Sequence, residues 1–221
     1  MFSIRRTLFA ASALAASAAL VDCAPPARNN TSSSGNAGQV TNTPPPSGGE
    51  APPLRSGPTT TAQVTAPAEA TPVQTRCDAS APESCNGLDD NCNGRIDEGC
   101  GYNGGGLQIT ASWQTDADIN LVVTDPQNRE VSEGHPAPGA TLDQTANFNC
   151  VRSRPTLENA VWSASRPPAG RYEVRLTAFD MCNAEETPVT VSISVGGRVV
   201  GTWRVPFSYA RQEHAFAVTV R

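Results

Sequence analysis

Residues 103–221 of this 221-residue chain are predicted to form an all-β domain, a β-sandwich. Apolar side chains there alternate with polar ones at a period of two, which places neighbouring residues on opposite faces of a strand. Gly196-Gly197 separates two such segments and suits a two-residue hairpin turn, because glycine tolerates positive φ. We find no helical period of useful length, and expect some seven or eight short strands in about 115 residues. The clearest alternating segments are 119–123, 172–178, 189–195 and 216–220.

The N-terminus, residues 1–22, is predicted to be an export signal. Arg5 and Arg6 form a basic start, and residues 7–21 are apolar and rich in alanine. This order is typical of a secretory signal peptide, and the apolar run is too short for a membrane-spanning helix. The protein is therefore expected to be exported.

Cys23 is the candidate for a lipid anchor. The segment Leu20-Val21-Asp22-Cys23 resembles a lipobox, although Asp22 stands where that pattern has a small neutral residue. Cys23 is also the odd one of seven cysteines, and an odd cysteine in an exported protein needs an explanation. A lipoprotein of the outer membrane or cell surface is expected, attached to the membrane through this anchor only. Cleavage after Ala16-Ser17-Ala18 would instead give a secreted protein.

Residues 23–76 are predicted to be a disordered linker. From residue 24 onward about a fifth of it is proline, most of the remainder is small or polar, and no aromatic residue occurs. Such a composition buries too little apolar area to offset the entropy of ordering. The linker is expected to hold a folded module away from its attachment point. A glycosylated stalk is the alternative, because Ser and Thr with Pro are also its signature.

Residues 77–100 contain the spacing of a calcium loop that starts at Asp89. Oxygen-bearing side chains occupy loop positions 1, 3, 5 and 9, a glycine at position 6 allows a sharp turn, and position 7 offers a backbone carbonyl. Position 12, a bidentate Glu in an EF-hand, is Cys100, so a weak site of roughly 10⁻⁴ to 10⁻³ M is expected. A polar loop of Asx turns closed by disulfides is the alternative. The predicted calcium ligands are Asp89, Asn91, Asn93, Arg95 through its carbonyl, Asp97 and the adjoining Glu98.

Four cysteines surround this loop, separated by seven, six and seven residues. Structural zinc sites bring their ligands in closer pairs, and neither histidine of the chain lies nearby, so zinc is disfavoured. Two disulfides that staple a loop too small to bury a core are predicted instead. Three pairings are possible, and the sequence does not choose among them. The cysteines are Cys77, Cys85, Cys92 and Cys100.

The run PESCNGLDDNCNGRIDEGC resembles the MopE-type metal-binding repeat of exported proteins from myxobacteria and related bacteria. The resemblance covers about 24 residues and includes Glu83, Asp90 and the Asp97-Glu98 pair. The loop is also similar to thrombospondin type 3 and dockerin calcium loops. The resemblance implies a bound metal ion. Copper, which is linked to the family name, is not expected, because copper prefers imidazole and thioether ligands and the segment has neither.

The C-terminal region is similar to a YfaP-like bacterial domain over about 100 residues. The motifs that match are the run from Trp113 to Pro126, then 158–162 and 168–174, in that order. Asn128-Arg129 replaces the glycine that usually follows Asp-Pro in this family. The resemblance implies an exported, Ig-like or fibronectin-like β-sandwich without assigned catalysis, which gives a fold and no activity. Cys150 and Cys182 are predicted to form its disulfide, because an oxidising compartment favours the bond over two thiols.

Two further constellations in the sandwich give weak signals. Ser165 or Ser208 could be combined with His135 or His214, but no nucleophile-elbow turn frames either serine, so catalysis is not expected. The acidic and amide side chains at positions 116, 118 and 120 share one face of a strand. They form either a second cation or sugar site or, as we prefer, a solvated face.

The sequence therefore predicts a non-enzymatic, exported, lipid-anchored cell-envelope protein with a calcium-binding loop and a partner-binding β-sandwich. The expected partner is a polysaccharide or another surface protein. The net charge of −5 leaves no basic stripe to neutralise phosphates, which excludes nucleic acid. One alternative is an accessory domain that tethers a secreted assembly to the envelope. A hydrolase without recognisable motifs is a remote one.

Overall fold

The structure, a computed structural model, describes residues 60–74 and 76–221. The predicted signal peptide, Cys23 and the linker up to residue 59 lie outside the described residues. The described chain belongs to one compact unit, which spans residues 53–221.

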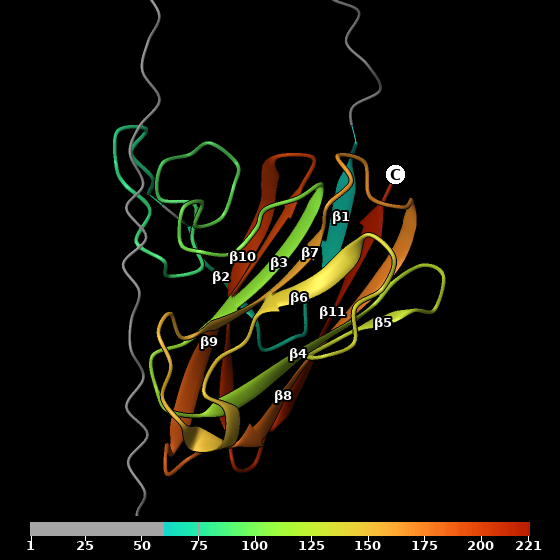
Figure 1. The fold of residues 1–221 in the computed structure, drawn as a ribbon. Coiled ribbons are helices and arrows are strands. Elements are labelled where there is room, and N and C mark those ends of the chain that lie inside the picture. Colours follow the sequence, from blue (N-terminus) through green and yellow to red (C-terminus); the bar gives the residue numbers. More distant parts are fainter. Residues whose placement is uncertain (1–59, 75) are drawn as a thin grey trace, which may run out of the picture. The chain divides into compact units, whose positions relative to one another are not determined.

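Two antiparallel sheets lie face to face and confirm the predicted β-sandwich (Figure 1). The first sheet has five strands in the order β1 (Ala62–Thr65), β11 (Glu213–Val220), β8 (Gly170–Asp180), β4 (Asp118–Thr124) and β5 (Glu130–Val131). The second has six, in the order β2 (Thr71–Pro72), β10 (Arg198–Ser208), β9 (Glu186–Val195), β3 (Leu107–Ser112), β7 (Leu157–Trp162) and β6 (Ala140–Gln144). A short 3-10 turn, η1 (Phe148–Cys150), precedes β7.

The predicted alternation places apolar side chains in the core between the sheets. In β8 the buried positions are Tyr172, Val174, Leu176 and Ala178, with mostly exposed residues between them. Trp162 packs edge-on against Tyr172, with ring centroids 5.2 Å apart. The Gly196-Gly197 hairpin between β9 and β10 is also confirmed, since both glycines have positive φ and Val195 pairs with Arg198.

Strands β3 and β7 are buried on both faces. Their inner side chains, such as Leu107, Ile109 and Trp162, belong to the core. The outward-facing side chains of β3 are polar, namely Gln108, Thr110 and Ser112, and they are buried as well. Polar groups in such a position need partners, and the cysteine-rich segment that covers this face provides several of them.

The prediction that the linker extends to residue 76 is wrong for residues 60–74. Strand β1 pairs with β11, in register from Ala62 opposite Val220, and β2 pairs with β10. Backbone bonds between Thr61 and Arg221 extend the first pairing. A short edge strand is held by its neighbour's backbone, so it needs little apolar sequence of its own.

A buried histidine also holds this N-terminal segment. The His214 ring has no exposed surface, and its Nδ1 lies 3.0 Å from Oε1 of Glu69. Its Nε2 lies 2.8 Å from the Pro206 carbonyl oxygen, which can only accept a hydrogen bond. Glu69 also pairs with Arg211. The histidine is therefore a packing and anchoring residue of the fold.

Candidate metal site in the cysteine-rich loop

Two interlocked disulfides staple residues 77–100. Cys77 bonds Cys92, and Cys85 bonds Cys100, with Cα atoms 5.4 and 5.6 Å apart. Each bond spans 15 residues, and the two loops overlap in sequence. The predicted staples are confirmed, and of the three possible pairings the structure has the crossed one. The bonds fix a segment that contains no helix and no strand.

Asp89 and the two asparagines after it organise the predicted calcium loop. Oδ1 of Asp89 accepts the backbone N–H of Asn93 at 3.1 Å, and Oδ2 accepts that of Gly94 at 2.8 Å. The amide oxygens of Asn91 and Asn93 each accept a backbone N–H two residues on, at 3.0 and 2.8 Å. In these Asx turns the side-chain oxygens face the backbone of the same loop. Each amide oxygen keeps a second lone pair.

Glu98 closes the loop from the other side. Its Oε1 accepts hydrogen bonds from the side-chain amides of both Asn91 and Asn93. Its Oε2 is buried and has no hydrogen-bond partner. Burial by itself would raise the pKa of the Glu98 carboxyl, but the hydrogen bonds from Asn91 and other groups outweigh it, so the pKa lies below its ordinary value. The Glu98 side chain is only partly buried, but a buried carboxylate oxygen without a partner is unfavourable, and a cation beside it would satisfy it.

Asp97, predicted as the ligand at position 9, points elsewhere. Its carboxylate accepts the N–H groups of Asn86 at 3.0 Å and Gly87 at 2.6 Å, and the hydroxyl of Tyr102. The side chain is drawn to these donors, and Glu98 takes its place beside the asparagines. The chain turns at Asp97 itself, which has a φ of 53°.

A second group of carboxylates forms around Asp97. One oxygen each of Glu83, Asp90 and Asp97 lies within 4.8 Å of the others. Burial raises the pKa of the Asp97 carboxyl, and the charge of Asp90 adds to the rise. Burial likewise raises the pKa of Glu83, with the charges of Glu98 and Asp90 adding to it. The calcium-loop spacing does not point to Glu83 and Asp90. Glu83 accepts the N–H groups of Asp90 and Asn91, and Asp90 accepts that of Ser84, so both carboxylates contact residues outside the spacing pattern.

The loop is docked on the outer face of the six-stranded sheet. Side chains of β3 and β9 donate to three of its carbonyl oxygens: Ser194 to Gly94 at 2.7 Å, Gln108 to Ile96 at 3.0 Å, and Ser112 to Asn86 at 2.5 Å. Ile96 is itself buried, with 1% of its surface exposed. The module and the sandwich therefore share an interface, in which Gln108 and Ser112 of β3 find partners, whereas Thr110 bonds Asn159 of β7.

Gly94 lets the loop approach the β9–β10 hairpin closely. A Cβ atom at this position would collide with the carbonyl group of Gly197, and the φ of +83° already disfavours any side chain. Gly99 has a similar φ of +88°, but a Cβ there would meet open space. Both glycines thus have a backbone conformation that disfavours a side chain, but only Gly94 also lies against the sandwich.

We expect Gly94→Ala to destabilise the protein more than Gly99→Ala. Both variants pay about 1 kcal/mol for a non-glycine residue at positive φ. Gly94→Ala adds the displacement of the loop from the hairpin, roughly 1–3 kcal/mol by analogy with overpacking. Urea unfolding of the two variants measures the difference. Equal losses of stability would show that the loop does not rest on the sandwich.

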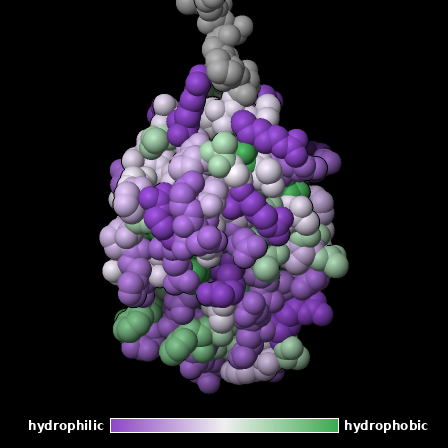
Figure 2. Space-filling view, turned by 90° about the vertical axis from the view of Figure 1, so that its right-hand side faces the viewer, coloured by the Kyte–Doolittle hydropathy of each residue, from purple (hydrophilic) through white to green (hydrophobic). Residues whose placement is uncertain are grey.

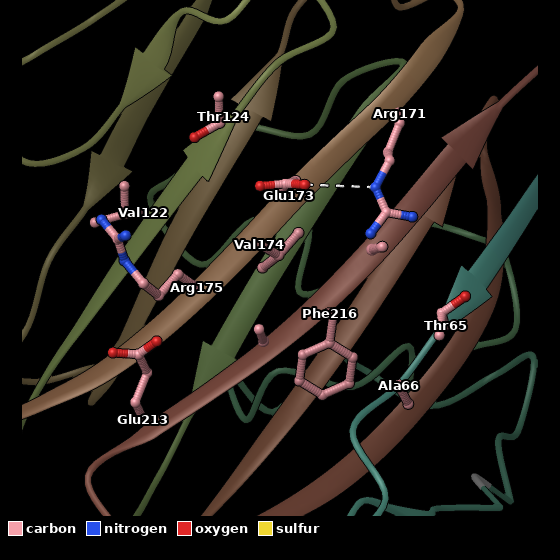
Figure 3. A pocket seen from close by; sticks show the side chains of 12 residues that line it. Thr65, Ala66, Val122, Thr124, Arg171, Glu173, Val174, Arg175, Glu213 and Phe216 are labelled. Carbon is pink, nitrogen blue, oxygen red and sulfur yellow. Dashed lines mark hydrogen bonds and ion pairs between the residues drawn. The ribbon is translucent and has the colours of Figure 1, made fainter.

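A shallow hollow of about 340 Å³ lies on the outer face of the five-stranded sheet. Figure 3 shows Arg171 and Glu173 turned toward each other on β8, with Thr65 and Ala66 on the far side of Phe216. The Arg171–Glu173 pair is 3.5 Å apart and mostly exposed, and such pairs contribute little. No histidine or cysteine lines this hollow, and it offers no convergent chemistry.

The other predicted constellations are not assembled into a site. Nδ1 of His135 lies 2.8 Å from the carbonyl oxygen of Glu133, and among the described residues no serine side chain is hydrogen-bonded to a histidine ring. Asp116 pairs with Arg152. Asp118 is buried and accepts the Asn149 N–H at 2.8 Å. The two aspartates thus have separate partners.

Cys150 and Cys182 form the predicted disulfide of the sandwich, with Cα atoms 5.5 Å apart.

Comparison of the chain with protein-family models, with curated proteins and with solved structures finds no match. Among the described residues, no helix is long and apolar enough to cross a bilayer.

Proposed function

We propose that this chain is an exported, lipid-anchored, non-enzymatic protein of the cell envelope, whose cysteine-rich loop binds calcium and whose β-sandwich binds a partner. The observation that carries the calcium proposal is the Glu98 carboxylate. It faces the side-chain amides of Asn91 and Asn93, while its Oε2 is buried without a partner. An ion among these groups would satisfy that oxygen.

The donor set suits calcium better than other metals. It consists of carboxylate, amide and carbonyl oxygens from Asp89, Asn91, Asn93, Arg95 and Glu98, and hard oxygen ligands favour calcium or magnesium over zinc or copper. Magnesium demands a stricter octahedron, whereas calcium accepts six to eight ligands in a flexible shell. With Asp97 bonded elsewhere, Glu98 is the second carboxylate of the proposed site.

Calcium would also stabilise the interface between the cysteine-rich loop and the sandwich. The carbonyl oxygen of Arg95 is the proposed backbone ligand. The carbonyl oxygens of its two neighbours, Gly94 and Ile96, accept hydrogen bonds from side chains of the sandwich. An ion that fixes the loop would therefore also fix its interface with β3 and β9. In the alternative role, an accessory domain that tethers a secreted assembly to the envelope, the same interface between loop and sandwich would be stabilised.

Calcium titration by calorimetry tests the site. The parent chain should bind one equivalent weakly, in the range of roughly 10⁻⁴ to 10⁻³ M. Asp89→Ala should abolish measurable binding, because it removes both the proposed ligand and the acceptor of two loop N–H groups. Asp116→Ala is the control, since Asp116 pairs with Arg152 away from the loop, and it should bind like the parent. Unchanged binding in Asp89→Ala would refute the site.

A further inference from the structure

All the large hydrophobic side chains that are exposed in the described chain lie at one end of the sandwich, in η1, at the end of β8 and in the connecting segments. They are Phe148, Val151, Phe179 and Tyr209, with 61–71% of their surface exposed; we call them the apolar tip. Strand pairing places them together, because the end of β8 lies beside the starts of β4 and β11. Figure 2 shows hydrophobic side chains gathered at its lower end. The described chain begins at the opposite end, where Thr61 bonds Arg221.

The apolar tip is held by a braced backbone. The Cys150–Cys182 disulfide joins the η1 segment to the loop after β8. Both cysteines have left-handed φ angles of 62° and 49°, as do Asn147, Asn149 and Asn183. Non-glycine residues adopt this conformation at a cost, and such residues cluster where a site is held in a set geometry. The disulfide thus ties the segment that carries Phe148 and Val151 to the end of β8, which carries Phe179.

Unpaired charge near the tip is mainly negative. Asp180, Glu185 and Glu186 make no ion pair within the described residues, and Arg154 is the basic residue there without an ion pair. The remaining tip arginines, at positions 152 and 211, are neutralised by Asp116 and Glu69. Glu185 and Glu186 also line a hollow of about 520 Å³ next to the β10–β11 turn.

We propose that the apolar tip is the surface that docks a polypeptide partner with an apolar centre and basic flanking residues. Exposed aromatic side chains on a rigid frame are the usual anchors of such interfaces. The acidic groups would repel an anionic bilayer and would face their own copies in a symmetric dimer. The inference deepens the partner-binding half of the proposed function and does not depend on the calcium loop.

Peptide selection against the full chain tests this. Random displayed peptides are selected on the immobilised protein, and the enriched ones are synthesised and measured by fluorescence polarisation. We expect aromatic or aliphatic residues next to Lys or Arg. Phe148→Ser and Phe179→Ser should each weaken binding about tenfold or more, without loss of fold, since both side chains are mostly exposed. As a separate variant, Glu185→Lys should also weaken peptide binding, and more so at low salt. Glu173→Lys, exposed in the middle of β8, is the matched control.

Other outcomes would overturn the proposal. These are an absence of enriched peptides, enriched peptides without basic residues, or peptides that bind the tip variants as well as the parent. Tip-dependent binding to phosphatidylcholine vesicles, or tip-dependent self-association in sedimentation, would assign the surface to lipid or to a second copy. Repeating the measurement with Asp89→Ala separates the two sites, because a lost calcium site should leave peptide binding unchanged.

Discussion

Replacement of the sandwich disulfide, as Cys150→Ala with Cys182→Ala, should lower the stability of the fold by roughly 3–4 kcal/mol. The bond joins residues 32 apart in sequence, so its loss frees a long loop in the unfolded chain. It also releases a segment in which several residues have left-handed φ angles. Thermal unfolding should show a melting temperature lower by about ten degrees.

The control for this variant is the parent protein after treatment with an alkylating agent under native conditions. It should keep its melting temperature, because a formed disulfide does not react. Equal melting of the double variant and the parent would mean that the two cysteines do not brace the fold, and would remove the support for a rigid tip.

The second large effect should come from Glu158, a carboxylic acid inside the sandwich. Its side chain extends from β7 into the core with 2% of its surface exposed, and Oε2 accepts the backbone N–H of Leu121 on β4 at 2.5 Å. Burial raises the pKa of Glu158 well above its ordinary value, and the charges of Glu133 and Asp118 add to the rise. The fold therefore favours the protonated carboxyl more strongly than the unfolded chain does.

The raised pKa makes the free energy of unfolding depend on pH. The contribution of protonated Glu158 is complete below the pKa of the unfolded chain, about 4.3. It is lost as the pH rises toward the folded pKa, at about 1.4 kcal/mol per pH unit for one proton. Glu158→Gln keeps an oxygen acceptor for Leu121 and needs no proton. The variant should lose less stability than the parent between mildly acidic and neutral pH.

Urea unfolding at several pH values measures this difference. Other carboxyls with raised pKa, such as Asp118 and Asp97, contribute to both proteins and cancel. Glu173→Gln, at an exposed position of β8, should follow the parent. Identical pH profiles for the parent and Glu158→Gln would show that Glu158 stays ionised in the fold.

The strands that sequence could predict are those with a buried and an exposed face. In β8 and β9 the period of two marks the core side chains directly, and the two glycines between β9 and β10 mark the turn. Strands β1 and β2 carry no comparable signal. Their order depends on backbone bonds to β11 and β10, which composition does not encode, so the Pro- and Thr-rich sequence predicts a linker there.

The geometry of the cysteine-rich loop can be predicted only in part, for a similar reason. Spacing identified Asp89, Asn91 and Asn93, because their roles follow from local Asx turns. The direction of Asp97 depends on Tyr102 and on a turn that the Cys85–Cys100 bond holds in place. Disulfide pairing and the docking of the loop on β3 are long-range features, and no local pattern specifies them.

Scanning calorimetry with and without calcium tests the central claim, that the calcium loop and the sandwich form one stabilised unit. At calcium concentrations of roughly ten to a hundred times the dissociation constant, binding to the folded state adds about 1.4–2.7 kcal/mol. We predict a single unfolding transition that calcium shifts upward by several degrees, and that Asp89→Ala makes insensitive to calcium. A transition that calcium does not move, or a separate small transition that alone responds, would contradict the account.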